Sequence, residues 1–93
     1  MVIGLLQARL SIPEARSLKD KRSVIRSLKD RIRNGFNASV AEVGDQDLWQ
    51  TAKMAFVTVA AEQDVVQKRL SKISTFLESN PRHVLLDLHT ELL

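Results

Sequence analysis

The spacing of the apolar residues switches between every second position and every third or fourth position along this chain, and this pattern limits the fold most. Residues 2–12 alternate between an apolar and a more polar set, which is typical of a strand with one face toward the core. Within it, Gly4 predicts a bulge or a close approach of another backbone. Pro13 ends the pairing because it has no N–H to donate. A helix follows at residues 17–33, with an apolar seam of Leu18, Ile25, Leu28 and Ile32.

Both ends of this helix carry recognisable residues. Ser17 and Asp20 have the spacing of a capping box, which begins a helix. Asn34 and Gly35 predict its end, because Gly35 can take the left-handed conformation. The helix is therefore bounded on both sides by the sequence itself.

The rest of the chain repeats the switch in spacing. Residues 36–43 alternate, residues 44–47 are turn-forming, and residues 48–60 are rich in strand formers. Residues 62–79 return to helical spacing, and residues 84–92 alternate again. The core seam of this second helix is Val66, Leu70, Ile73 and Leu77.

The element order is β-α-β-β-α-β, and 93 residues form one domain, residues 1–93. The predicted fold class is α+β, a ferredoxin-like sandwich with a four-stranded antiparallel sheet. Right-handed crossovers give the strand order 4-1-3-2. Both helices then cover one face of the sheet, and the other face is left open.

Positive charge is concentrated in the first helix. Residues 16–33 hold eight of the fourteen Lys and Arg residues and only two acids, so this segment carries +6 while the rest of the chain carries −3. Five cations recur at spacings of three and four and fall within roughly 80° of arc beside the apolar seam. We call these five residues the basic stripe: Lys19, Arg22, Arg26, Lys29 and Arg33.

A cationic stripe of this kind favours binding to a polyanion, because each phosphate contact releases counterions. The predicted nucleic-acid contacts are the five stripe residues together with Lys21. Lys21 falls inside the apolar arc, so its ammonium is expected to reach past the sheet edge into solvent. The central strands offer no exposed aromatic to stack bases, so we expect contacts to phosphates and shape rather than base reading. The alternative is a helix face that is simply solvated.

The open sheet face presents a second candidate surface. Ala52, Met54 and Phe56 suit the core side of the third strand, so Val57 and Val59 require either a bulge or apolar residues on the open face. A contiguous apolar patch on such a face is typical of a partner site, and a twofold dimer is the commonest outcome. The predicted interface residues are Ile3, Leu5, Val57 and Leu85. The alternative is a face that Gln7, Arg9, Lys53 and Asp87 keep soluble.

No constellation supports catalysis, a metal or a cofactor. The chain has no cysteine, and neither a phosphate loop nor a dinucleotide fingerprint is present. Asp87, His89 and Glu91 share one strand face but lack a second histidine placed to join them, so pairing of Asp87 with Arg9 is the better account. His83 is expected at the surface. The chain is therefore predicted not to be an enzyme.

Trp49 admits two interpretations. It is either a hydrophobic plug near the sheet edge or an exposed contact residue, and we favour the plug.

Several segments carry a family resemblance, namely the first strand running into Pro13, residues 15–24, residues 36–43 and residues 47–50. Together they resemble the YlxP-like family, small bacterial proteins classed as a domain of unknown function, and the resemblance covers essentially the whole chain. Ala38 is smaller than the valine expected there. The resemblance implies a ferredoxin-like fold and a cytoplasmic bacterial protein. Members are often encoded beside translation and ribosome-maturation factors, which implies a role near RNA, and no catalytic residues carry over.

These observations favour a small, non-enzymatic cytoplasmic protein that binds RNA or the ribosome through the first helix. The alternative is a homodimeric structural or protein-interaction module that uses the open sheet face. No apolar run approaches the ~20 residues that span a membrane, and no basic leader precedes an apolar stretch, so neither a membrane nor a secretion route is expected. Nothing in the sequence points to a small-molecule substrate.

Overall fold

A computed structural model describes all 93 residues and confirms the predicted element order. The elements are β1 (Val2–Ser11), α1 (Leu18–Gly35), β2 (Ser39–Gly44), β3 (Thr51–Ala60), α2 (Gln63–Ser79) and β4 (Val84–Leu92). The strands form one antiparallel sheet in the order β2-β3-β1-β4, which is the predicted order read from the opposite edge. The fold is therefore the ferredoxin-like α+β arrangement.

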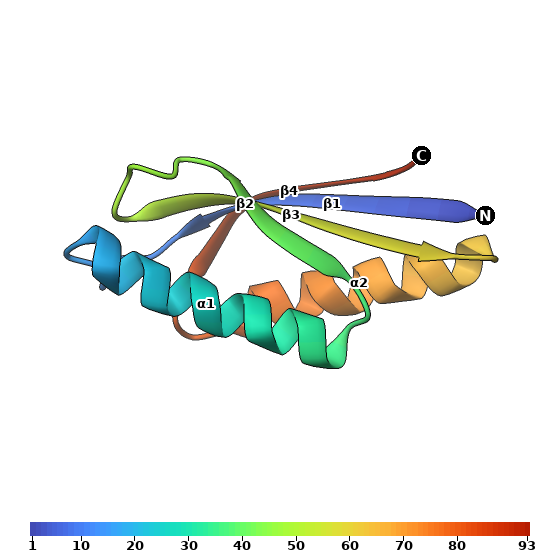
Figure 1. Ribbon diagram of the computed structural model, residues 1–93, viewed down its shortest axis with the longest axis horizontal. Coiled ribbons are helices and arrows are strands. Elements are labelled where there is room, and N and C mark those ends of the chain that lie inside the picture. The colour runs from blue at the N-terminus through green and yellow to red at the C-terminus, as the bar shows by residue number, and fades with distance from the viewer.

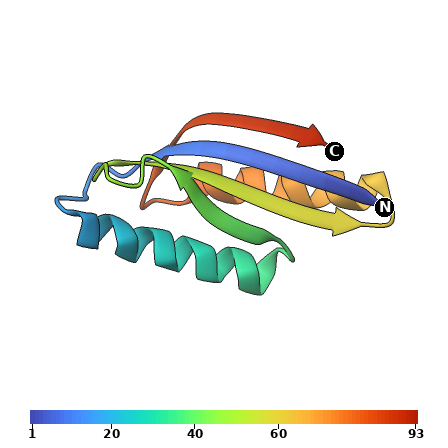
Figure 2. The same ribbon diagram turned by 45° about the horizontal axis from the view of Figure 1, so that its top comes forward.

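The molecule has two layers. Both helices lie against the same face of the sheet, and the opposite face carries no covering element (Figure 1). In Figure 2, α1 runs below β2 while α2 lies behind β1 and β4. The molecule is long and narrow, with extents of 42 × 20 × 17 Å. Neither helix combines the length and the hydropathy that crossing a membrane requires.

The core forms between the helices and the sheet, as the alternation predicts. Leu6 and Leu10 of β1 are fully buried, and the predicted core side of β3 is buried too. The two helical seams meet these strands through buried residues that include Ile25, Ile32, Ile73 and Leu77. The β1–β3 register runs without a shift, so Val57 and Val59 are apolar residues of the open face and no bulge is needed to explain them.

Gly4 marks a close approach between β1 and α2. A Cβ at this position would meet Val66 Cγ1 and lie 3.0 Å from Leu70 Cδ1. β1 is not bulged at this position, and the atoms close to Gly4 are side-chain atoms of α2 rather than another backbone, so neither sequence interpretation was correct. The neighbouring element is a helix, which the strand pattern alone did not identify.

The ends of α1 differ in detail from the prediction. The Ser17 Oγ accepts a hydrogen bond from the Asp20 backbone N–H at 3.1 Å, which confirms the N-cap. The Asp20 carboxylate accepts from the Arg16 backbone N–H at 3.0 Å, so the return bond of the capping box comes from one residue earlier. At the other end, α1 ends at Gly35 as predicted, but Gly35 stays helical and the left-handed residue is Asn37, with φ of 49°.

The start of β2 also differs from the prediction. It begins at Ser39 rather than residue 36, because the Phe36 ring packs against Phe76 of α2 with 5.3 Å between ring centroids.

A bulge in β4 overturns one predicted interface residue. Arg9 pairs with Asp87 but Leu10 pairs with Leu85, which leaves Leu86 as an extra residue in the strand. One extra residue reverses the side on which the preceding side chains lie. Leu85 therefore packs against the core, and its assignment to the open face was wrong.

Candidate nucleic-acid interface

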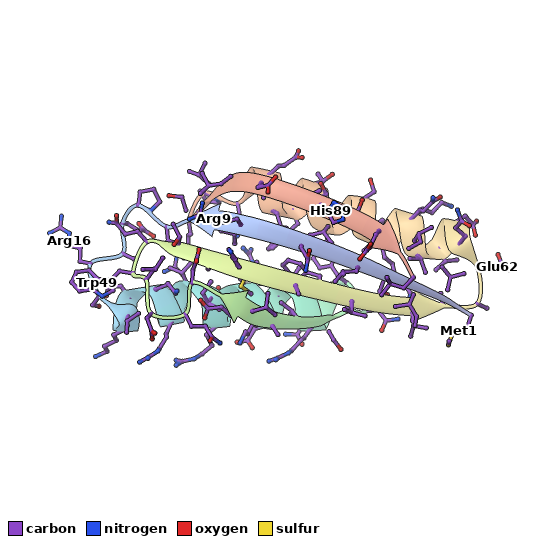
Figure 3. All side chains as sticks on the ribbon, turned by 90° about the horizontal axis from the view of Figure 1, so that it is seen from above. Met1, Arg9, Arg16, Trp49, Glu62 and His89 are labelled. Carbon is purple, nitrogen blue, oxygen red and sulfur yellow. The ribbon has the colours of Figure 1, made fainter.

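The basic stripe lies on α1 with its cations unneutralised. All five residues are exposed except Lys29, which is half-buried. The ion pairs of the protein involve Arg9, Lys21 and Arg82, and none involves a stripe residue. At about 1.5 Å per residue, the stripe extends about 21 Å along the helix. In Figure 3, nitrogen-tipped side chains project from α1 beyond the β2 edge of the sheet. The stripe is thus a row of cations that form no ion pair.

A shallow groove follows the stripe beside β2. Its volume is about 330 Å³. It is lined by four stripe residues and by Ile25, Asp30 and Glu42. Residues three and four apart are neighbours on a helix surface, so successive cations lie about 5–6 Å apart at their Cβ atoms. This arrangement suits a chain of phosphates better than a single small anion.

Lys21 is not part of this surface, contrary to the sequence interpretation. Its side chain is 1% exposed, and its Nζ lies 2.8 Å from the Glu42 carboxylate. The ammonium also donates to the backbone oxygens of Asp45, at 2.6 Å, and Thr51, at 2.9 Å. Lys21 lies inside the apolar arc of the helix, and this position indicated burial. Its partners lie at least 21 residues further along the chain, and the helix pattern did not reveal them.

The contacts of Lys21 hold the loop between β2 and β3. Gln50 holds its other end, because its side-chain amide donates to the backbone oxygens of Pro13, at 3.2 Å, and Ala15, at 3.1 Å. The Ile12 backbone N–H donates to the Gln50 backbone oxygen at 2.8 Å. The loop is therefore tied to the segment that leads into α1.

Trp49 projects from this tied loop into solvent. Its exposed fraction is 54%, so the interpretation as a hydrophobic plug was wrong. Leu48 beside it is 50% exposed. Figure 3 places Trp49 near Arg16, at the end of the molecule where α1 begins. The sequence identified the turn at residues 44–47, but it extended the following strand back to Leu48.

Arg9 pairs across the open face with a residue of this loop. Its Nε donates to the Asp45 carboxylate at 3.2 Å, whereas the expected partner was Asp87. The Asp87 carboxylate accepts instead from the Leu88 backbone N–H. Burial alone raises the pKa of Asp45, but the side chains of Arg9, Thr51 and Lys53 together outweigh it and hold this pKa below its ordinary value.

His83 is buried, although it was expected at the surface. It is 5% exposed, and its Nε2 donates to the Leu77 backbone oxygen at 2.8 Å, near the end of α2. Burial disfavours the charged imidazole and lowers its pKa, and the carbonyl contact offsets this only in part. His83 therefore joins α2 to the start of β4.

The open face carries an apolar patch on its two central strands. Ile3 pairs with Val59 and Leu5 pairs with Val57, so the four side chains adjoin in two rows. Val57 is 39% exposed and Val59 is 54% exposed. Three of the four predicted interface residues thus lie together on this face, with Val59 in place of Leu85.

The acidic and histidine residues of β4 do not form a ligand cluster. No group of three or more His, Asp or Glu side chains gathers as metal ligands, and His89 lies opposite Gln7 in the sheet. The site with the clearest chemistry is therefore the basic stripe.

Comparison with known proteins places this chain in a family. The family model described as "Protein of unknown function (DUF503)" matches residues 3–90. The chain is also similar to "Uncharacterized protein YlxP" of Bacillus subtilis (strain 168), with 34% identity over 80 residues. That match covers 86% of this chain and 87% of the Bacillus protein. The chain therefore belongs to the DUF503 family, the family of the Bacillus YlxP protein.

Proposed function

We propose that this protein is a non-enzymatic, cytoplasmic RNA-binding protein that contacts RNA phosphates, free or within the ribosome, through the basic stripe. The observation that supports the proposal is the set of five cations on one face of α1 with no acidic partner. Charges already paired inside a protein gain little from a phosphate, whereas unpaired charges gain the full interaction.

The open sheet face supports phosphate contacts over base reading by the sheet. Proteins that read RNA on a four-stranded sheet stack bases on aromatics of the central strands. The only aromatic residue in β1 or β3 is Phe56, which is fully buried. Binding through α1 is therefore expected to depend strongly on salt and weakly on sequence.

Charge reversal within the stripe tests the proposal. The variant R22E/R26E should lose retention on purified ribosomal subunits, measured by co-sedimentation at graded salt. The matched control is K68E/K72E on α2, which makes the same change in net charge at two exposed positions. The control should sediment like the wild type. Equal retention of both variants, or no salt-sensitive binding by the wild type, would contradict the proposal.

A second candidate function is self-association through the open face, and the adjoining pairs Ile3–Val59 and Leu5–Val57 favour it. A second copy of the chain would cover these side chains. Light scattering at high concentration should then give twice the 10.5 kDa chain mass. The variant L5K/V57K should restore the single mass. A wild type of single mass at high concentration would exclude this function.

A further inference from the structure

The β2–β3 loop combines two properties that do not usually occur together. Hydrogen bonds from Lys21 and Gln50 tie it to the core and to the segment before α1. Yet it leaves two large apolar side chains, Leu48 and Trp49, about half exposed. A loop that is held in place and presents an aromatic ring is preorganised for contact, because binding then costs little conformational entropy.

The position of the ring links it to the basic stripe. Gln50, the next residue, donates to the Ala15 oxygen just before α1 begins. The stripe starts at Lys19, within the first turn of α1. Figure 3 shows Trp49 at the same end of the molecule as Arg16, which is exposed and makes no ion pair. An exposed aromatic ring therefore lies at one end of the basic stripe.

We infer that Trp49 stacks on a base and that the RNA bound along the basic stripe is an unpaired strand. This inference rests on the proposed function. Proteins that bind single strands without sequence preference combine a cationic track with aromatic side chains on which bases stack. In a duplex the base faces are covered by their neighbours, so a duplex gains from the stripe but not from Trp49.

Charge complementarity selects this ligand over a protein partner. Trp49 and Leu48 alone are compatible with either, since exposed aromatics are common at protein interfaces. The five unpaired cations, together with Arg16, favour a polyanion along the adjoining surface.

Trp49 also supplies its own probe. The chain has one Trp and no Tyr, so the tryptophan fluorescence of the protein reports on Trp49 alone. Titration with a single-stranded RNA of about 12 nucleotides should quench that emission at saturation. The matching RNA duplex should bind with a salt-dependent affinity and leave the emission almost unchanged.

Variants give the second readout, measured as anisotropy of the labelled single strand. W49A should weaken binding roughly 5- to 100-fold and leave the salt dependence unaltered, because the ring carries no charge. W49F should recover most of the loss. L48A, which removes a neighbouring exposed side chain, should bind within about twofold of the wild type.

The outcomes separate this inference from the proposed function. Salt-dependent binding with equal affinity for wild type and W49A, and unchanged emission, would overturn the stacking inference and leave the stripe intact. Absence of salt-dependent binding to ribosomal subunits and to both RNAs would overturn the two together.

Discussion

At the scale of single residues, buried polar groups decide what the surface can do. Lys21 belongs to the most basic segment of the chain, yet its ammonium is committed to Glu42 and two backbone oxygens. Breaking a buried pair by removing one partner leaves an uncompensated charge, which is costly. Lys21 is therefore a structural residue that fixes the loop bearing Trp49.

The variant K21M should lower the free energy of unfolding by about 3–5 kcal/mol, because Glu42 would lose its partner. Urea denaturation measures this change. The control K19M, at an exposed position that forms no ion pair, should change it by less than about 0.5 kcal/mol. Equal stabilities of the two variants would contradict a stabilising role for the buried ammonium.

His83 makes stability depend on pH in a defined direction. Because its pKa in the folded protein is lowered, the unfolded chain takes up a proton below pH ~6.5 that the folded protein does not. The free energy of unfolding should therefore fall as pH drops from 7 to 5, by at most about 1.4 kcal/mol per pH unit.

The matched variant is H83Q, whose amide can still donate to the Leu77 oxygen. Denaturation midpoints at pH 7 and pH 5 should then differ less than in the wild type. A pH dependence that H83Q leaves unchanged would assign it to another group.

At the scale of elements, the sequence carried most of the information. Strong periodicity predicted all six elements and the topology, because each face had to be buried against one common core. One error arose where a backbone irregularity changed the pattern. The extra residue Leu86 reversed the side taken by Leu85, and alternation alone does not show which residue is extra.

The contact between β1 and α2 depends on the absence of a side chain at Gly4. G4A should lower the free energy of unfolding by about 1–3 kcal/mol, because Val66 is stiff and fully buried and α2 would have to shift. G35A is the control, since a Cβ there meets nothing and the position is helical. It should be neutral or stabilise by up to about 1 kcal/mol. Thermal denaturation of both variants tests the difference, and a G4A as stable as G35A would contradict the close packing.

At the scale of the whole molecule, charge and hydrophobicity are divided between surfaces. The stripe lies on α1 beside β2, the apolar patch lies on the opposite face of the sheet, and Trp49 lies at the end where α1 begins. The sequence predicted the first two surfaces, because each follows from the period of one element. The third depended on hydrogen bonds that tie the β2–β3 loop to α1 and to the segment before it, and exposure of Trp49 was the less favoured of the two sequence interpretations.

The central claim is that the basic stripe binds RNA phosphates, and the salt dependence of RNA affinity tests it most directly. Each phosphate contact to a single strand contributes about −0.7 to the slope of log affinity against log salt. Five contacts predict a slope near −3.5, or a loss of roughly 100-fold between about 50 and 200 mM salt. R22Q/R26Q should reduce that slope by about 1.4, while K68Q/K72Q on α2 should leave it unchanged. A slope near zero, or one that both variants reduce equally, would contradict the claim.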